Sequence, residues 1–186
     1  MKKFWDEGVS YDTYLQQAQE SVDHPKTQLE KDYHEYYVLG VQRMNRMSKI
    51  YQPDEEQLKT LAEKKFKGKI LIIAEPWCGD ASQALPVVHS FFSGYAIRIT
   101  YRDQTPSLID DFLSNGSKSI PKIIFLDENF KVISSWGPRP AYGHELFMKH
   151  KADPGTYTEE ELHNDLQVYY AKNKGIDTIQ EILALI

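Results

Sequence analysis

A run of six residues, KILIIA at Lys69–Ala74, constrains the fold of this chain more than any other segment. It is short, continuous and rich in β-branched Ile, a pattern typical of a strand that is buried on both faces of a sheet. A short polar link follows, and then SQALPVVHSFF, which has the composition of a helix interrupted by Pro86. A buried strand that runs directly into a helix indicates an α/β fold.

The next segments complete a mixed sheet. Tyr95–Arg102 alternates apolar and polar residues and predicts a strand, and Thr105–Leu113 begins with Thr-Pro and predicts a helix. Lys122–Leu126 and Lys131–Trp136 predict two strands joined by a turn of hairpin length. Strands joined through helices should be parallel, and the hairpin strands antiparallel. We therefore expect a mixed sheet with both faces covered by helices.

Helical segments precede and follow this sheet. The three before it are predicted at Ser10–Gln19, Pro25–Tyr51 and Asp54–Phe66, the last ended by Gly68, and the three after it at Tyr142–His150, Thr158–Lys174 and Thr178–Leu185. Ser10 is the predicted N-cap of the first helix, and TEEE at Thr158 resembles a capping box. The longest helix carries an apolar stripe, which we interpret as packing against a core: Leu29, Tyr33, Tyr36, Val41, Met44, Met47 and Tyr51. We predict one domain, residues 1–186, with an N-terminal helical extension (1–66), a central α/β core (67–137) and C-terminal helices (138–186).

The chain has a single cysteine, Cys78, among its 186 residues. No disulfide can form within the chain, which favours a reducing compartment, and we expect a cytoplasmic protein. The formal net charge of −5 argues against nucleic-acid binding, because a basic surface is needed to neutralise phosphates. The N-terminal segment lacks the apolar core of a secretory signal, and no apolar run could span a bilayer. Nucleic acids and membranes are therefore not expected as partners.

Cys78 lies in the link EPWCGDAS, where the predicted strand ends and the helix begins. The unpaired N–H groups of a helix N-terminus stabilise a thiolate and lower the pKa of a cysteine from its usual ~8.5. Trp77 offers a flat apolar surface, and Gly79 lets another backbone approach closely. The carboxylate of Asp80 has the opposite effect, because a nearby negative charge disfavours the thiolate. The sequence leaves open which effect is larger, and an inert Cys78 stays an alternative.

The segment WCGDA resembles WCGPC, the active-site motif of the thioredoxin family. Pro86, eight residues after Cys78, is similar to the proline of the family's active-site helix. Ser119-Ile120-Pro121 and the following KIIFLDENFKVISSWG resemble the family's cis-proline strand, hairpin and closing glycine. The resemblance covers about Phe66–Gly137, and the flanks look like a bacterial thioredoxin-like subfamily with helical extensions. It implies a thioredoxin fold, with extra helices at both ends.

The resemblance also implies a binding site around Cys78. In the family a cis-proline, here Pro121, faces the reactive sulfur, and the residue before it, Ile120, offers its backbone to an extended substrate segment. Gly137 lies on the same rim, and Arg139 follows it as a candidate anion-binding residue. With Trp77, Gly79 and Asp80 these form the expected substrate-binding set, and Cys78 is the expected nucleophile.

Two departures from the family change the expected chemistry. The second cysteine of the motif falls on Ala81, and the buried acid of many members falls on Ile72. A dithiol cycle within one chain is therefore impossible, and the resemblance implies a monothiol oxidoreductase whose mixed disulfide is resolved by an external thiol. The expected partner is a thiol- or disulfide-bearing protein or a small-molecule thiol. The alternative is a redox-inactive module that binds a partner in the same groove.

Other candidate sites are weaker. The six histidines show neither HxxxH nor a Cys/His spacing, so no metal site is expected, and without a nucleotide-binding motif no cofactor is expected. The CGFS motif of iron–sulfur glutaredoxins is absent. Arg43, Arg46 and Lys49 are interpreted as a solvated basic face, and an anion clamp is the alternative.

Overall fold

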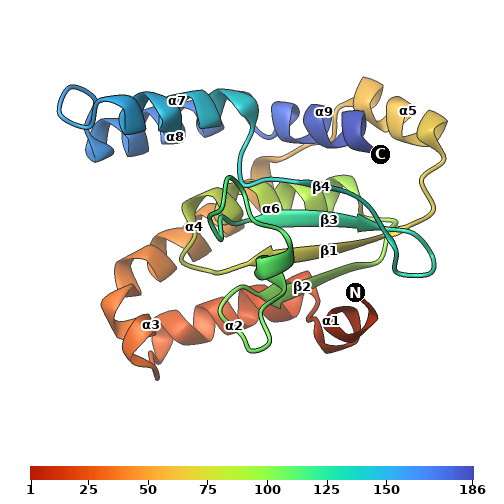
Figure 1. The fold of residues 1–186 in the computed structure, drawn as a ribbon, viewed down its shortest axis with the longest axis horizontal. Helices are drawn as coiled ribbons and strands as arrows, with labels where there is room; N and C mark the ends of the chain where they lie inside the picture. The colour runs from red at the N-terminus through yellow and green to blue at the C-terminus, as the bar shows by residue number, and fades with distance from the viewer.

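A computed structural model describes residues 1–186 and contains one mixed four-stranded sheet in the order β2-β1-β3-β4 (Figure 1). The strands are β1 (Lys69–Ala74), β2 (Ile97–Tyr101), β3 (Lys122–Leu126) and β4 (Val132–Trp136). β1 pairs with β2 in parallel and with β3 in antiparallel orientation, and β3 and β4 form an antiparallel hairpin. The predicted mixed sheet is confirmed, and β1 has the predicted bounds.

Nine α-helices and one 3₁₀ turn surround the sheet. Five helices precede it: α1 (Lys2–Glu7), α2 (Tyr11–Asp23), α3 (Gln28–Asp32), α4 (His34–Ile50) and α5 (Glu55–Lys64). Helix α6 (Gly79–Phe91) begins directly after Cys78, and the 3₁₀ turn η1 is Leu108–Asp111. Three helices follow the sheet: α7 (Ala141–Ala152), α8 (Glu159–Asn173) and α9 (Ile176–Leu185). None of them combines the length and hydropathy that a membrane-spanning helix requires.

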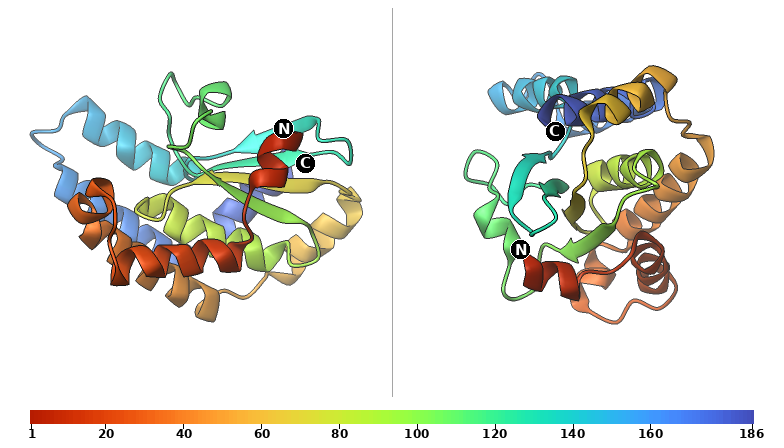
Figure 2. Two further views of the ribbon diagram at one scale, coloured as in Figure 1. Left: turned by 90° about the horizontal axis from the view of Figure 1, so that it is seen from below. Right: turned by 90° about the vertical axis from the view of Figure 1, so that its right-hand side faces the viewer.

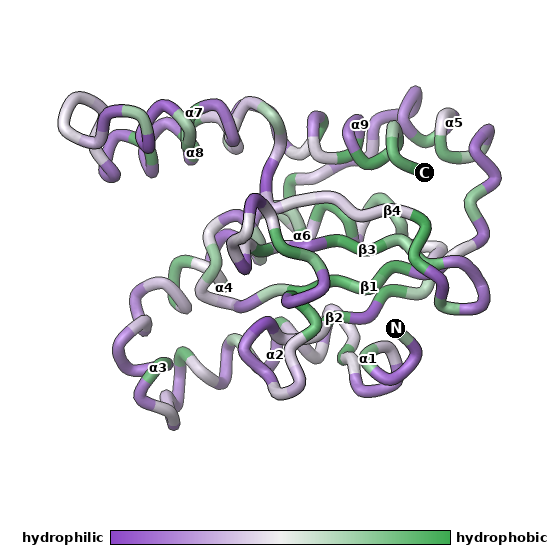
Figure 3. The backbone as a smooth tube through the Cα atoms, in the orientation of Figure 1, coloured by the Kyte–Doolittle hydropathy of each residue, from purple (hydrophilic) through white to green (hydrophobic).

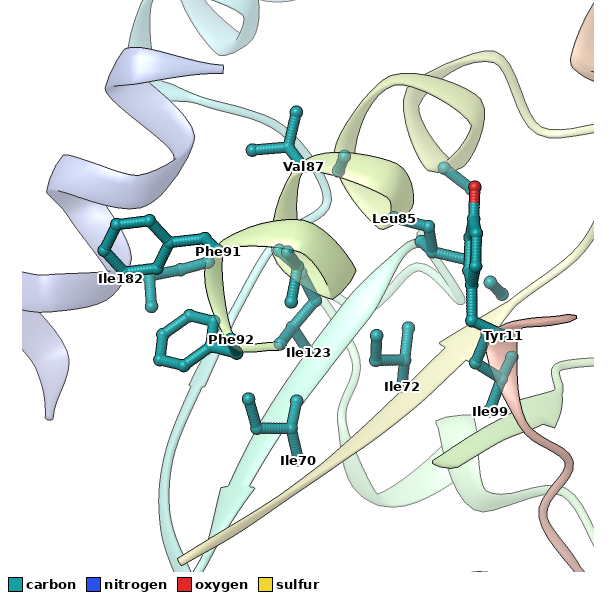
Figure 4. Close-up of a cluster of buried hydrophobic side chains, with 14 of the residues drawn as sticks. Tyr11, Ile70, Ile72, Leu85, Val87, Phe91, Phe92, Ile99, Ile123 and Ile182 are labelled. Carbon is teal, nitrogen blue, oxygen red and sulfur yellow. The ribbon is translucent and has the colours of Figure 1, made fainter. Parts of the chain in front are cut away.

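The two faces of the sheet are covered unequally. Ile70 and Ile72 of β1 point into a cluster of 25 buried residues between the sheet and helices α4, α6 and α9 (Figure 4). Leu71 and Ile73 point the other way, into a cluster of seven that the turn η1 and helix α1 cover. This alternation follows from the two-residue period of a strand. It explains why KILIIA is apolar throughout.

Helix α6 lies between the sheet and α4 (Figure 2). The contact is close because Gly40 has no side chain: a Cβ there would lie 2.2 Å from the carbonyl oxygen of Pro76. Met44 and Met47 of α4 are 1% exposed and belong to the larger cluster. The N-terminal helices are therefore part of the packed body, and α4 is held against the segment that precedes Cys78.

The predicted helix Pro25–Tyr51 is wrong, because α3 and α4 are separate helices. Thr27 begins α3 with a capping box that it forms with Glu30. Tyr33 then leaves the helical region, with φ −104° and ψ 15°, and its ring lies against Trp77 at 5.6 Å between centroids. The break between α3 and α4 therefore coincides with a contact between Tyr33 and Trp77, and the periodicity of apolar residues does not reveal such a contact.

Two further predictions need correction. The expected helix at Thr105–Leu113 is only the turn η1: Leu108 and Ile109 are fully buried, but Phe112 is already outside the helical region. Helix α5 ends at Lys65, which takes the left-handed conformation (φ 52°), and not at Gly68. The N-caps predicted at Ser10 and Thr158 are confirmed by their side-chain hydrogen bonds.

Helices α7 and α8 form a hairpin that projects from the body of the molecule (Figure 1). Its core is a separate cluster of four buried residues, Tyr157, Leu162, Leu166 and Tyr170. In Figure 3 the strands β1 and β3 are strongly hydrophobic, whereas this hairpin is mostly polar. The hairpin therefore has little apolar surface to bury against the sheet.

Candidate functional site

A groove with a volume of about 790 Å³ opens above the N-terminus of α6. Its floor is Trp77–Asp80 and its rim includes Ser117–Ile120. One wall comes from the α3–α4 region and the other from the α7–α8 hairpin. The residues of these two walls are Tyr33, Tyr36, Leu39 and Arg43 on the first, and Phe147, His150, Glu159, Leu162, His163, Leu166 and Gln167 on the second.

The structure brings most of the expected site residues to this groove. Six of the eight line it: Trp77, Cys78, Gly79, Asp80, Ile120 and Arg139. The other two, Pro121 and Gly137, are not among its lining residues. Gly137 has φ +121°, and a Cβ there would lie 2.1 Å from the carbonyl oxygen of Pro121, so the two backbones are in close contact. The Ile120–Pro121 peptide bond is cis.

Cys78 is the N-cap residue of α6 and is partly exposed. Its Sγ donates a hydrogen bond of 3.3 Å to the carbonyl oxygen of Ile120. Burial of the sulfur, and after it the charge of Asp80, raises the pKa of the Cys78 thiol to about 12. The N–H groups of Ala81 and Asp80 and the charge of Arg139 oppose this rise but do not cancel it. The helix N-terminus therefore does not give Cys78 a lowered pKa, and the thiol is protonated at rest.

Asp80 is held by two residues that come from outside the strand–helix unit. Arg139, just after β4, places Nη2 2.7 Å from Oδ2, and the hydroxyl of Tyr170 on α8 donates to Oδ1 at 2.6 Å. Asp80 is 8% exposed, and burial raises the pKa of its carboxyl while Arg139 and Tyr170 oppose the rise. The C-terminal helices thus fix the acid that lies next to Cys78.

Cations outnumber anions among the charged residues that line the groove. Arg102 lies over the Trp77 ring at 4.7 Å and pairs with Asp103 at 2.7 Å. Arg43 is half-buried, its guanidinium forms no ion pair, and burial lowers the pKa of this group. The full set of lining charges is Arg43, Arg102, Lys118 and Arg139 against Asp80 and Glu159.

The family is decided by a comparison with protein-family models, in which a thioredoxin model matches residues 26–153. The chain belongs to the thioredoxin family. The matched region includes the wall helix α4 as well as the sheet and α7. No curated protein matches this thioredoxin-family chain.

Two solved structures are similar to the thioredoxin-family chain along nearly its whole length. A Pseudomonas aeruginosa protein of unknown function is 15% identical, with a TM-score of 0.61, and the match covers 98% of this chain and 93% of that one. An HIV epitope-scaffold is 15% identical, with a TM-score of 0.60, and covers 99% and 95%. At this identity the likeness shows the fold alone.

Sequence reasoning missed the walls of the groove in this thioredoxin-family protein. In the apolar stripe of the longest predicted helix, Tyr33 and Tyr36 are 42% and 52% exposed and line the groove, whereas Val41 and Met44 are buried. Arg43, for which the sequence favours a solvated basic face with an anion clamp as the alternative, also lines the groove. The sequence carries no signal that places these residues, or those of the α7–α8 hairpin, beside Cys78.

Proposed function

We propose that this thioredoxin-family protein is a monothiol thiol–disulfide oxidoreductase with Cys78 as its nucleophile. The proposal depends mainly on the position of the Cys78 sulfur, at the floor of the groove and 3.3 Å from the Ile120 carbonyl. Cys78 is the one sulfur nucleophile of the chain. The proposed substrate contacts are Trp77, Gly79, Asp80, Ile120 and Arg139, which line the groove, and Pro121 and Gly137, whose backbones are in close contact directly after Ile120 and β4.

The proposed reaction has two exchange steps. In the first, Cys78 loses its proton and its sulfur attacks the L-side sulfur of a disulfide R–S–S–L; the mixed disulfide Cys78–S–S–L forms, the S–S bond of the substrate breaks, and R–S⁻ leaves and takes up a proton. In the second, an external thiol L′–SH gives up its proton and its sulfur attacks the L-side sulfur of Cys78–S–S–L, which releases L–S–S–L′ and restores the Cys78 thiol. Overall, the R sulfur is reduced to a thiol and the sulfur of the external thiol takes its place in a disulfide.

A second candidate function is favoured by the protonation state of Cys78. Because the thiolate is the nucleophile, a thiol with a pKa of about 12 reacts slowly at neutral pH. The same groove could then bind its ligand without redox chemistry, as a binding module. The single cysteine supports a reducing, cytoplasmic setting for either function.

The test is the reaction of the folded protein with bis(2-hydroxyethyl) disulfide at pH values from about 7 to 10, followed by mass spectrometry. We expect one adduct, on Cys78, whose rate of formation rises over the whole pH range, and recovery of free thiol when excess 2-mercaptoethanol is added. The Cys78→Ser variant controls for other sites. If the native chain forms no adduct while the urea-unfolded chain does, Cys78 is not a redox nucleophile, and the binding module is the better account.

A further inference from the structure

The groove has the dimensions of a small-molecule site. Its volume of about 790 Å³ lies within the range of roughly 300–1,000 Å³ that is usual for ligand pockets. Cys78 lies at its floor, between the α4 wall and the α7–α8 hairpin. Two walls on either side of a partly buried sulfur restrict the approach of a folded protein, whereas a small disulfide can enter between them.

The lining of the groove is richer in cations than the molecule as a whole. The whole chain has a formal net charge of −5, yet four Lys and Arg residues and only two acidic residues line the groove. Three of the four cations have an acidic partner at 2.7 Å: Arg102 pairs with Asp103, Lys118 with Asp110 and Arg139 with Asp80. The unpaired positive charge of the fourth, Arg43, favours an anionic ligand over a neutral or cationic one.

Arg43 is the cation best placed to bind that anion. Arg102 and Arg139 have acidic partners, Asp103 and Asp80, whereas the guanidinium of Arg43 has none. Its Nη1 lies 3.4 Å from the point that a Cβ on Gly79 would occupy, so it is next to the first residue of α6. A half-buried guanidinium without a partner is a preorganised donor for a carboxylate or phosphate.

The wall that carries Arg43 also offers apolar surface. Tyr33, Tyr36 and Leu39 are 42%, 52% and 41% exposed, and all three line the groove. Tyr33 packs on the Trp77 ring with 5.6 Å between the centroids, and the three side chains provide contact for the carbon skeleton of a ligand. The groove thus combines an apolar wall, an unpaired cation and a sulfur at its floor.

We propose that the groove binds a small anionic disulfide or its mixed-disulfide derivative, with the acid group on Arg43 and the disulfide next to Cys78. The part of this proposal that concerns the disulfide rests on the proposed oxidoreductase function, but the anion site does not. In the exchange step, Cys78 loses its proton, an S–S bond forms between Cys78 Sγ and the sulfur of the anionic half, the S–S bond of the ligand breaks, and the other half leaves as a thiolate that takes up a proton.

Three disulfides that differ in charge test the proposal: 3,3′-dithiodipropionate (anionic), bis(2-hydroxyethyl) disulfide (neutral) and cystamine (cationic). The rate of adduct formation on Cys78 is measured for the wild type, Arg43→Gln and the matched control Arg46→Gln, which removes an exposed charge from the same helix outside the groove. Each probe is compared between variants, so that differences in intrinsic disulfide reactivity cancel.

We expect Arg43→Gln to slow the anionic probe about tenfold, to leave the neutral probe unchanged and to accelerate the cationic probe. Arg46→Gln should leave all three rates nearly unchanged. Equal effects of Arg43→Gln on the three probes would mean that Arg43 acts on the thiol or the fold and not on a ligand charge, and would overturn the anion site while leaving the oxidoreductase function intact.

A binding measurement separates the two proposals when no exchange is observed. Cys78→Ser removes the nucleophile, and its affinity for 3,3′-dithiodipropionate is measured by calorimetry with and without Arg43→Gln. Binding that Arg43→Gln weakens about tenfold supports the anion site even if the wild-type chain forms no adduct. Absence of binding to Cys78→Ser overturns the anion site, whatever the reactivity of Cys78.

Discussion

At the scale of single residues, the site depends on the balance between a thiol and a neighbouring acid. Cys78 has the helix N-terminus that stabilises thiolates, yet burial and the charge of Asp80 raise the pKa of its thiol to about 12. Asp80 is held in place by Arg139 at 2.7 Å. The reactivity of the sulfur therefore depends first on its burial and second on the charge of Asp80, and a substitution of Asp80 tests the second effect alone.

Replacing Asp80 with Asn should lower the pKa of Cys78. The substitution removes a negative charge near the sulfur and releases the positive charge of Arg139, and both changes favour the thiolate. We expect the pH midpoint of iodoacetamide alkylation to fall by at least about one unit. Asp103→Asn is the control, because it removes the exposed carboxylate that pairs with Arg102. An unchanged or higher midpoint in Asp80→Asn would show that burial alone sets the pKa.

Glu75 is a second buried acid, and it should make stability depend on pH. It is 6% exposed, and burial raises its pKa from 4.5 to about 7, although the N–H of Asp103 donates to its Oε1 at 3.0 Å. The folded chain therefore binds a proton between these pH values that the unfolded chain releases. Its contribution to stability is complete below pH 4.5 and is lost as the pH rises to about 7.

In Glu75→Gln the unfolding free energy should fall less than in the wild type as the pH rises through this window. The difference between the two proteins should approach about 3 kcal/mol above pH 7. Urea denaturation at pH values from about 4.5 to 8 measures it, and Glu63→Gln, on the exposed face of α5, is the control. Parallel curves for wild type and Glu75→Gln would mean that Glu75 stays ionised in the fold.

At the scale of the elements, the position of α4 depends on a glycine. Alanine at residue 40 gains about 1 kcal/mol in helix propensity, but its Cβ would lie 2.2 Å from the Pro76 carbonyl oxygen. A backbone atom cannot rotate away, so α4 must shift, at a cost of roughly 1–3 kcal/mol. We expect Gly40→Ala to be destabilising in urea and to alter the alkylation rate of Cys78, because Pro76 precedes the floor of the groove.

Gly94→Ala, in the turn between α6 and β2, is the control for this substitution, because a Cβ at Gly94 meets nothing within 4 Å. It should change the unfolding free energy by less than about 0.5 kcal/mol. If Gly40→Ala were as stable as the wild type, the contact between α4 and the Pro76 segment would be loose, and the groove wall would not be fixed by it.

The sequence predicted elements where local chemistry decides them. The bounds of β1, the pairing of the hairpin and the caps at Ser10 and Thr158 follow from composition, turn length and side-chain hydrogen bonds. The break between α3 and α4 was missed because Tyr33 lies against Trp77, 44 positions away by residue number. Periodicity reports which residues could share a face, but it does not report which of them a distant element covers.

The candidate site shows the same division. Cys78 and Ile120 could be placed by motif, and the structure brings them to 3.3 Å. Arg43 and Tyr36 could not, because they reach the groove only through the packing of α4 on α6. The sequence also could not predict whether the pKa of Cys78 is raised or lowered, because this shift depends on how deeply the sulfur and Asp80 are buried.

At the scale of the whole molecule, the two helical extensions form the walls of a groove beyond the carboxyl end of β1, a central strand of the sheet. The C-terminal extension contacts the body of the molecule in two ways, through apolar packing of α9 and through polar contacts of the α7–α8 hairpin. Helix α9 joins the larger core, and its Glu181 accepts hydrogen bonds from Trp136 and from the N–H of Ala141, both at 2.8 Å. The α7–α8 hairpin has its own small cluster and reaches the body through polar contacts, among them Tyr170 with Asp80 and Gln167 with Gln83.

This arrangement predicts that the hairpin opens independently of the sheet. Local opening requires less free energy where few apolar contacts are lost, so the amides of α8 should exchange with deuterium faster than those of β1 and β3 under native conditions. Tyr170→Phe removes the 2.6 Å hydrogen bond to Asp80, and a bond to a charged group contributes about 1.5–3 kcal/mol. The variant should therefore accelerate exchange in α8 about tenfold or more and leave β1 unchanged.

Tyr142→Phe is the control for the hairpin, because Tyr142 is 51% exposed and its ring packs on Tyr169 within the same part of the chain. Loss of that hydroxyl should not change the exchange of α8. If Tyr170→Phe accelerated exchange in α8 and β1 equally, the hairpin would unfold together with the sheet, and the width of the groove would be fixed. If only α8 responds, the wall opposite Arg43 moves as a unit, and access to Cys78 depends on the hydrogen bond between Tyr170 and Asp80.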